Sequence, residues 1–148
     1  MAGFDDLPYL RTGGRGFLWH GELFVTGRLA DLIELDGRLI HPEDVEHTVE
    51  RSTTVLHGRR CAAVPYGERD DEIAVAAEIR LPLPLEGQHR AAIESVIREA
   101  VAAQHGVQIA QIVLLPIGTI PVTTSGKVQR VKTQALIAHP QPEAALVK

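Results

Sequence analysis

The 148-residue chain has the composition of a globular domain, with 45% hydrophobic and 23% charged residues. Folding at this length removes roughly 70% of the unfolded chain's surface from water, and with only three Phe, two Tyr and one Trp the core must be aliphatic. Nineteen Asp and Glu against fifteen Lys and Arg give a net charge of -4. That balance argues against a protein that binds nucleic acid or anionic lipid by general attraction to phosphate.

The sequence also bears on the cellular compartment. No run approaches the roughly 18 apolar residues of a membrane helix, so no membrane span is expected. The N-terminus MAGFDDLPYLR is acidic where a signal peptide is basic and then apolar, and we expect the cytoplasm. Cys61 is the single cysteine, which excludes an internal disulfide, and its strand-like setting RRCAAVP favours a small buried residue over a reactive thiol.

Two β-hairpins and a helix are predicted in the first third of the chain. Residues 19–27, WHGELFVTG, alternate in polarity beside a His-Gly turn, and DLIELDGR repeats the pattern with a turn at Asp36-Gly37. HPEDVEHTVERS then predicts a short amphipathic helix. Its proline suits the first helical position, its acidic residues suit the positive end of the helix dipole, and Val45 and Val49 share a face.

The remainder predicts three strands and two more helices. GRRCAAVPYG and DEIAVAAEIRL are expected to pair as strands across YGERDD, and QIVLLP is expected to form a last strand. QHRAAIESVIREAVAAQHG predicts the longest helix, which Gly106 ends in a left-handed conformation. Its inward stripe is Ile93, Val96, Ile97, Ala100 and Val101, and a terminal helix in VQRVKTQALIAH turns Val131, Ala135 and Ile137 inward. These elements predict one α+β domain over residues 1–148, with 139–148 as a flexible tail.

The stretch IPVTTSGKVQR, residues 120–130, places one lysine on a small polar turn. A phosphate-binding loop has a glycine that four residues separate from its Gly-Lys pair, and a hydroxyl residue after the lysine. Pro121 and Val128 occupy those two places, so the turn is not such a loop. On these residues alone Lys127 is either a solvated surface lysine beside a helix cap or a lysine held out by Gly126. The hydroxyls of Thr123, Thr124 and Ser125 can satisfy local backbone donors or cap the following helix.

Three segments in register carry a resemblance to a known family. They are Leu10 to Gly16, the TGR followed by HPEDVE, and the P-x-T-x-S-G-K-x-x-R turn. Together they resemble the C-terminal domain of acyl-adenylate-forming enzymes, most closely fatty acyl-AMP ligases, from Leu7 to about Ile137. The resemblance implies a small mobile lid of α+β fold that closes over a large N-terminal domain, absent from this chain, which binds ATP with Mg²⁺ and the fatty acid.

The resemblance also implies roles for three residues. Lys127 matches the lysine that the lid delivers to the reacting carboxylate and α-phosphate. Arg28 matches an arginine near the nucleotide ribose, and Asp31 matches the hinge about which the lid rotates between adenylation and acyl transfer.

No metal site is expected, because His41 and His47 are six residues apart and no cluster of other ligands accompanies them.

Three positions depart from the family pattern. Gly14 in RTGGRG stands where the family has an aspartate that holds the ribose hydroxyls, Ala30 replaces the hinge lysine, and Leu39 replaces an asparagine. Losing hydrogen bonds to a charged acceptor costs on the order of 1.5–3 kcal/mol each, so weaker ATP binding is expected.

The leading hypothesis is therefore the lid of a fatty acyl-AMP ligase, which acts with its N-terminal domain on a fatty acid and transfers the acyl group to the phosphopantetheine of an acyl carrier protein. The alternatives are the lid of a fatty acyl-CoA ligase, or a degenerate, non-catalytic module that binds a carrier protein, for which Gly14 and Ala30 are the motivation. Alone, the chain is expected to be inactive.

Overall fold

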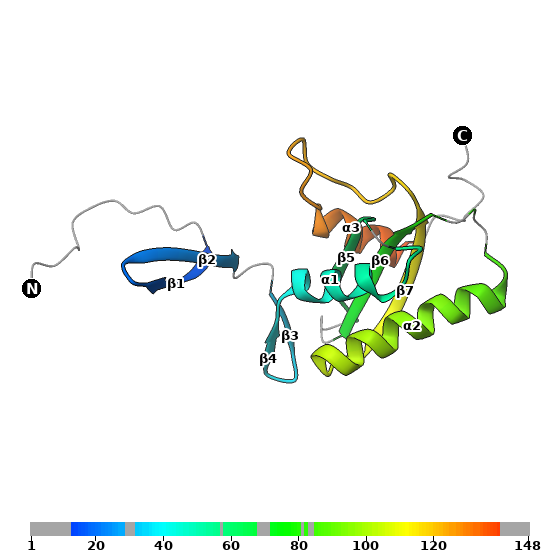
Figure 1. The fold of residues 1–148 in the computed structure, drawn as a ribbon. Coiled ribbons are helices and arrows are strands. Elements are labelled where there is room, and N and C mark those ends of the chain that lie inside the picture. The colour runs from blue at the N-terminus through cyan, green and yellow to red at the C-terminus, as the bar shows by residue number, and fades with distance from the viewer. Residues whose placement is uncertain are drawn as a thin grey trace, which may run out of the picture. The chain divides into compact units, whose positions relative to one another are not determined.

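The computed structural model divides the chain into two compact units, Met1–Leu32 and Ile33–Lys148 (Figure 1). The structure describes residues 13–28, 32–56, 58–67, 72–80, 82 and 85–139, and the side chains of residues 15 and 26–28 are outside that description. The assignment of 1–148 to a single lid domain stays a prediction, as does the flexible tail, of which residues 140–148 lie outside the described part.

The first unit contains the predicted hairpin. β1 (Gly14–Trp19) pairs antiparallel with β2 (Glu22–Arg28) across the His-Gly turn. The register shifts between Arg15 and Gly16, where the strands approach closely: a Cβ added to Gly16 would lie 2.4 Å from the carbonyl oxygen of Phe24. Only glycine fits this bulge without moving the backbone.

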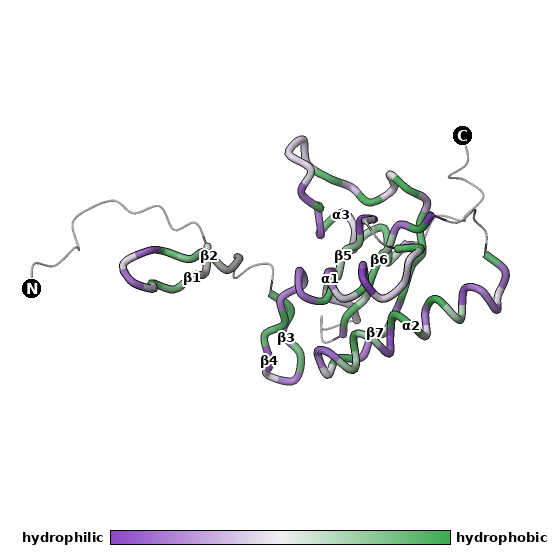
Figure 2. The backbone as a smooth tube through the Cα atoms, in the orientation of Figure 1, coloured by the Kyte–Doolittle hydropathy of each residue, from purple (hydrophilic) through white to green (hydrophobic). Residues whose placement is uncertain are grey.

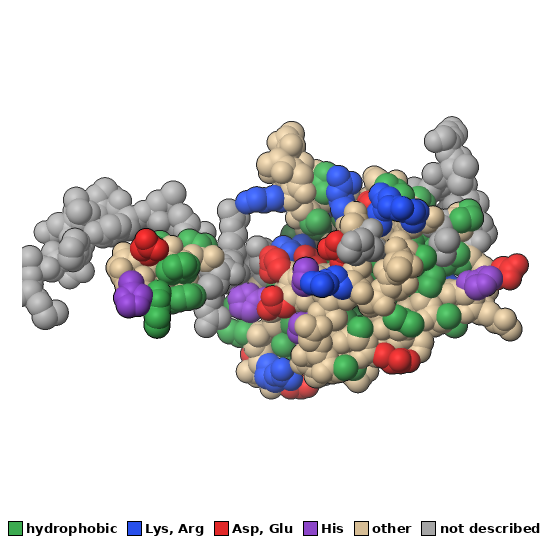
Figure 3. All heavy atoms as spheres, viewed as in Figure 1, with side chains coloured by type: hydrophobic (Ala, Val, Ile, Leu, Met, Phe, Trp, Pro, Cys, Tyr) green, Lys and Arg blue, Asp and Glu red, His purple; other side chains and the backbone are tan. Residues whose placement is uncertain are grey.

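This hairpin exposes large apolar side chains on both of its faces. Figure 2 shows hydrophobic residues along its two strands, and Figure 3 shows hydrophobic side chains on the face of the hairpin that is in view. Phe17 and Phe24 are cross-strand partners whose stacked rings lie 5.3 Å apart on one face. Leu18, Leu23 and Val25 share the opposite face, and each of them is at least 67% exposed. A two-stranded hairpin in water is marginally stable and gains nothing from apolar groups left in solvent.

The second unit begins with the other predicted hairpin and helix. β3 (Ile33–Leu35) and β4 (Arg38–Ile40) pair antiparallel around the Asp-Gly turn, and α1 (Pro42–Ser52) follows. Val45 and Val49 are fully buried, which confirms the predicted inward face of this helix.

A three-stranded sheet forms the centre of the second unit. β5 (Cys61–Tyr66) pairs antiparallel with β6 (Glu72–Ile79), as predicted, and β6 pairs in parallel with β7 (Ile109–Pro116). The order β5-β6-β7 makes β6 the central strand. The parallel pairing follows from the crossover helix α2 (Gly87–His105), which joins β6 to β7.

Helices cover both faces of the sheet, α1 and α2 on one and α3 (Arg130–Ala138) on the other (Figure 1). Residues at odd positions of β6 pack in the first core: Ile73, Val75, Ala77 and Ile79. Ala74 and Ala76 pack in the second core, with Ile120 and Ile137. Every residue from 73 to 79 is therefore buried, including Glu78, because the strand is central and covered on both sides.

The inward faces of two helices differ from the sequence prediction. In α2, Ile97 and Val101 are buried and Gly106 ends the helix in a left-handed conformation as predicted, but Val96 is 41% exposed. In α3, Ile137 is buried as predicted, whereas Val131 is 82% exposed and Ala135 is also exposed.

A tertiary contact explains the phase of α3. Thr133 is buried with Ile137, one turn apart, and the Gln134 side chain donates to the carbonyl oxygen of Pro65 at 3.0 Å. These contacts turn Val131 and Ala135 toward solvent, which hydrophobic periodicity in a nine-residue helix did not reveal.

The α+β fold class is thus confirmed, with three helices and small sheets in the part of the chain that the structure describes. Among the described helices, none is both long and apolar enough to cross a membrane.

Candidate functional site

Lys127 follows the tip of a tight hairpin loop between β7 and α3. A bridge between Val122 and Val128 closes the loop. The N–H of Thr123 donates to the carbonyl of Lys127 at 2.8 Å, and the N–H of Gly126 donates to the carbonyl of Thr123 at 2.9 Å. This is the pattern of a three-residue loop whose last residue is left-handed, and Gly126 has a φ of 83°.

Hydroxyl groups reinforce the loop from inside. The Thr123 hydroxyl accepts the Lys127 N–H at 3.1 Å and lies 2.9 Å from the Ser125 hydroxyl. These contacts confirm that the polar residues satisfy local backbone donors. They do not cap α3, because its N-cap residue, Gln129, has no side-chain capping bond.

The Lys127 side chain itself is exposed. Within the described ranges, its ammonium group makes no hydrogen bond or ion pair. A flexible four-carbon stem with a free point charge at its end suits the pairing of an anion that arrives from outside.

The arm that leads into the loop is tied to the sheet. The N–H of Ile120, which is 2% exposed, donates to Oε1 of Glu78 at 2.9 Å. Farther along, the Gln129 N–H donates to the carbonyl of Pro121 at 2.9 Å, and its side-chain amide donates to the carbonyl of Val122 at 2.6 Å. The two arms are therefore fastened to each other below the lysine.

The arm that leaves the loop is tied to α1 through Arg130. The Arg130 Nε donates to Oε1 of Glu46 at 3.1 Å, and its Nη2 donates to Oε2 at 3.0 Å. Nη2 also lies 3.0 Å from Oε1 of Glu43. A two-point pairing of guanidinium with carboxylate fixes orientation as well as distance.

Glu46 holds the centre of this cluster. Its Oε1 also accepts the N–H of Ala63 at 3.0 Å, which joins α1, β5 and α3 through one carboxylate. Burial raises the pKa of Glu46 above its ordinary value of 4.5, and the hydrogen bonds and charge of Arg130 act in the opposite direction.

Cys61 lies beside the same cluster and is chemically quiet. Its thiol donates to the backbone carbonyl of Glu46 at 3.1 Å, and burial raises the pKa of the thiol to about 12. The prediction of a small buried residue is confirmed, because a thiol with so little thiolate is a poor nucleophile.

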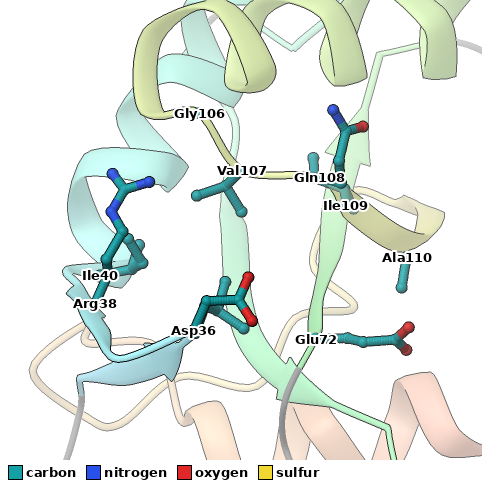
Figure 4. Close-up of a pocket in the computed structure, with 10 residues that line it drawn as sticks. Asp36, Arg38, Ile40, Glu72, Gly106, Val107, Gln108, Ile109 and Ala110 are labelled. Atoms are coloured by element: carbon teal, nitrogen blue, oxygen red, sulfur yellow. The ribbon is translucent and has the colours of Figure 1, made fainter.

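A pocket of about 270 Å³ lies elsewhere in the second unit, between the β3–β4 hairpin and the start of β7 (Figure 4). Asp36 and Glu72 are among the residues that line it, and Arg38 donates to the carbonyl of His105 at 3.1 Å, at the end of α2. None of the residues that line the pocket belongs to the lysine loop.

The other predicted site residues are only partly described. Arg28 ends β2 opposite Gly14, the position that departs from the family pattern, and nothing is described of the Arg28 side chain. Asp31, the predicted hinge, and Ala30 lie outside the described residues. Leu39 lies in β4 and is 49% exposed. Arg28 and Asp31 belong to the first compact unit, and Lys127 belongs to the second.

The two histidines weighed as metal ligands are described. His41 precedes α1 without a side-chain capping bond, and the Nε2 of His47 lies 3.3 Å from Nη1 of Arg51. In the part of the chain that the structure describes, no three His, Cys, Asp or Glu side chains gather where they could share a metal ion.

Sequence reasoning assigned no role to Arg130, Glu46 or Glu78. A signal was present for Arg130, because a cation in the first turn of a helix is repelled by the helix dipole and is more stable beside a carboxylate. Glu78 also carried a signal, as a lone charge inside the apolar strand EIAVAAEI. Neither signal identifies the partner group, because the partners are far apart in the sequence. Arg130 and Glu46 are separated by 84 positions, and Glu78 and Ile120 by 42.

Comparison with known proteins identifies the family. The model of the Disco-interacting protein 2-like AMP domain matches residues 30–139. The chain is 41% identical over 134 residues to the medium-chain-fatty-acid–[acyl-carrier-protein] ligase JamA of Moorena producens (strain JHB), covering 88% of this chain and 22% of that protein. It is also 41% identical over 128 residues to a putative fatty-acid–CoA ligase of Mycobacterium tuberculosis, covering 83% and 21%.

A solved structure from studies of fatty acyl-adenylate ligases of E. coli and L. pneumophila aligns with a TM-score of 0.71 and 32% identity, over 85% of this chain and 22% of that chain. The chain thus spans about a fifth of the length of the proteins it matches. By the family model and these relatives, the chain belongs to the Disco-interacting protein 2-like AMP domains, within the acyl-adenylate-forming, fatty acyl-AMP ligase-like proteins.

Proposed function

We propose that this chain is the mobile C-terminal lid of a fatty acyl-AMP ligase and that Lys127 is the residue it delivers to the reaction. The observation that carries the proposal is the position of this lysine. Its ammonium group is exposed beyond a tight loop, while both arms of the loop are anchored to the sheet and to α1. Such a side chain reaches outward from a rigid base.

The chemistry explains the choice of a lysine. Attack of a fatty acid carboxylate on the α-phosphate of ATP brings two anions together, and the transition state spreads further negative charge over the phosphate oxygens. An ammonium that pairs with both reactants on closure stabilises that charge and aligns the attack. The carboxylate is already a nucleophile, so Lys127 moves no proton.

The chain leaves most of the substrate binding to a partner domain. The P-x-T-x-S-G-K-x-x-R turn supplies a cation and no phosphate-binding loop. In the described residues no acidic cluster gathers that would hold Mg²⁺. We assign ATP, Mg²⁺ and the fatty acid mainly to the large N-terminal adenylation domain, with Arg28 as this chain's contribution near the ribose and Asp31 as the hinge.

The hairpin of β1 and β2 supports such a partner. Apolar groups on both faces of an isolated two-stranded hairpin are stable only when other parts of a protein cover them. The exposed side chains of Phe17, Leu18, Leu23, Phe24 and Val25 fit that description. A large adenylation domain of the same protein is the partner we propose.

We propose the phosphopantetheine thiol of an acyl carrier protein as the acyl acceptor, in keeping with the name of the JamA relative. Coenzyme A is the second candidate, and the name of the M. tuberculosis relative favours it. Acyl transfer assays with a carrier protein and with coenzyme A, on the enzyme that this chain forms with its adenylation domain, separate the two acceptors.

The decisive experiment is ATP–pyrophosphate exchange by that enzyme. Lys127→Ala is expected to lower the exchange rate by about two to three orders of magnitude, the effect of losing one group that stabilises transition-state charge. Lys132→Ala is the matched control, because Lys132 is also exposed and lies in the first turn of α3. Its exchange rate is expected to stay within about twofold of wild type.

Equal exchange rates for the wild type and Lys127→Ala would remove the catalytic role of the lysine. No exchange by the wild type, together with retained binding of a carrier protein, would support the degenerate module that Gly14 and Ala30 suggest.

A further inference from the structure

We propose that Arg130 and Glu46 are positioning residues for Lys127, joined in a clamp that fixes the lysine loop against α1. This inference rests on the proposed role of Lys127 in adenylate formation. Neither residue is assigned to the reacting atoms. Their task is to set where the loop begins and in which direction it projects.

The contacts of the clamp are specific in geometry and largely buried. Guanidinium and carboxylate meet through two hydrogen bonds, of 3.1 and 3.0 Å, and the side chains are only 20% and 15% exposed. Burial of this kind excludes water and salt that would weaken a surface pair. Glu46 is itself held by the N–H of Ala63 in β5, so the carboxylate cannot turn away from Arg130 without breaking a third bond.

The clamp lies at the place where it controls the lysine. Arg130 is the first residue of α3 and follows Lys127 by three positions. Gln129, the residue between them that fastens the two loop arms, is bonded through both its backbone and its side chain. The path from Lys127 to Glu46 is therefore short, and the hydrogen bonds of Gln129 and Arg130 hold it in place.

Arg130 stands at an electrostatically unfavourable place for a helix alone. The first turn of α3 contains no acidic residue, and both Arg130 and Lys132 place positive charge at the positive end of the helix dipole. The carboxylates of Glu46 and Glu43 in α1 pair with the charge of Arg130. Within the described residues the ammonium group of Lys127 makes no such contact, so it stays available while the carboxylates of α1 hold Arg130.

The first test measures the order of the loop in the chain itself, which has its own buried core. Arg130→Met removes both hydrogen bonds to Glu46 and the one to Glu43, Arg130→Lys keeps the charge without the two-point geometry, and Glu46→Gln keeps the side-chain volume. In Arg130→Met the backbone order parameters of Gly126 and Lys127 are expected to fall from about 0.85 to below about 0.6, while those of β6 stay near 0.85.

The second test measures kinetics in the enzyme that this chain forms with its adenylation domain. The kcat for adenylate formation is expected to fall about tenfold in Arg130→Met, because a small displacement of a catalytic group is enough to slow a reaction. The KM values for ATP and fatty acid are expected to stay within about twofold. Arg130→Lys and Glu46→Gln are expected to lose about threefold in kcat, a partial rescue that a residue of purely structural importance would not give.

Glu94→Gln is the matched control for both tests. It breaks the Arg90–Glu94 ion pair of α2, in which a guanidinium and a carboxylate lie 2.9 Å apart. Neither residue belongs to the lysine loop. Loop order and kcat are expected to match wild type.

Three outcomes overturn the clamp. They are unchanged loop order in folded Arg130→Met and Glu46→Gln, unchanged kcat in those variants, or a rise in KM for ATP with kcat preserved, which would mean direct contact with the nucleotide. If the loop loosens as expected while Lys127→Ala has wild-type activity, the proposed function fails and the anchoring alone stands. If Lys127→Ala is inactive while the loop stays ordered in the clamp variants, the clamp fails and the proposed function stands.

Discussion

The buried carboxylate of Glu78 accepts a hydrogen bond from the backbone N–H of Ile120 at a distance of 2.9 Å. Glu78 is 1% exposed and Ile120 is 2% exposed, so neither group has water as an alternative partner. This contact joins the central strand of the sheet to the arm that leads into the lysine loop.

Two replacements of Glu78 therefore test the contribution of its hydrogen bond and that of its charge separately. Glu78→Ala leaves the Ile120 N–H buried without an acceptor and is expected to lower the free energy of unfolding by about 1–3 kcal/mol. Glu78→Gln keeps an acceptor oxygen and removes a buried charge, and its free energy of unfolding is expected to stay within about 1 kcal/mol of wild type. Urea unfolding of the three proteins measures both changes, and a Gln variant as unstable as the Ala variant would contradict this account.

Gly126 provides a test of the loop geometry. With a φ of 83°, this position strains any residue that carries a Cβ, although the space around it is open. Gly126→Ala is expected to lower the free energy of unfolding by about 1–2 kcal/mol, the cost of a left-handed L-residue. Gly87→Ala is the control, because Gly87 begins α2 with open space around it and no positive φ. Urea unfolding should show the control at or slightly above wild-type stability.

Glu46 predicts a pH dependence of stability. Its pKa is raised above 4.5 by burial, with Arg130 lowering it and Glu43 raising it to smaller extents. The folded protein therefore binds this proton more tightly than the unfolded chain. The resulting contribution to stability is complete below pH 4.5 and is lost as the pH rises through the folded-state pKa.

Arg130→Met removes the largest cause that lowers this pKa, so the pKa of Glu46 is expected to rise further. The loss of stability then extends to higher pH than in wild type. Carboxyl carbon NMR titration measures the pKa, and urea unfolding across the same pH range measures the stability. A pKa of Glu46 that is unchanged or lower in Arg130→Met would show that the guanidinium does not act on this carboxylate.

Gly14 tests whether the chain retains full use of ATP. The resemblance places an aspartate at this position, and Gly14 lies in β1 directly opposite Arg28. Gly14→Asp is expected to lower the KM for ATP about tenfold, since hydrogen bonds to a charged acceptor are worth about 1.5–3 kcal/mol. Gly14→Asn, which offers a neutral acceptor, is expected to give a smaller decrease. A KM that is unchanged or higher in Gly14→Asp would mean that this position does not face the ribose.

Local signals explain why most elements were predictable. The His-Gly and Asp-Gly turns, the proline at the start of α1 and Gly106 at the end of α2 each act on neighbouring residues, and the structure has each of them as predicted. The lysine loop belongs to this group, because its shape follows from Thr123 and Gly126 within five residues.

The phase of α3 and the environment of β6 were not predictable in the same way. Val131 and Ala135 lie outward because Arg130 and Gln134 are held by α1 and β5, which are distant in sequence. Period two in β6 marked one buried face, but the opposite face is covered by α3 and buries Glu78 as well. Which faces of a strand are covered depends on how helices pack on the sheet, so the pattern within the strand did not reveal it.

The sequence by itself determined the turns, the start of α1, the end of α2, the family, and the lysine on its polar turn, because these depend on backbone preferences and on motifs of consecutive residues. Tertiary structure decided what holds that lysine in place. The carboxylates of Glu46 and Glu78 reach Arg130 and Ile120 only after α1, the sheet and α3 have packed, since a buried carboxylate is stable only where folding brings donors to it.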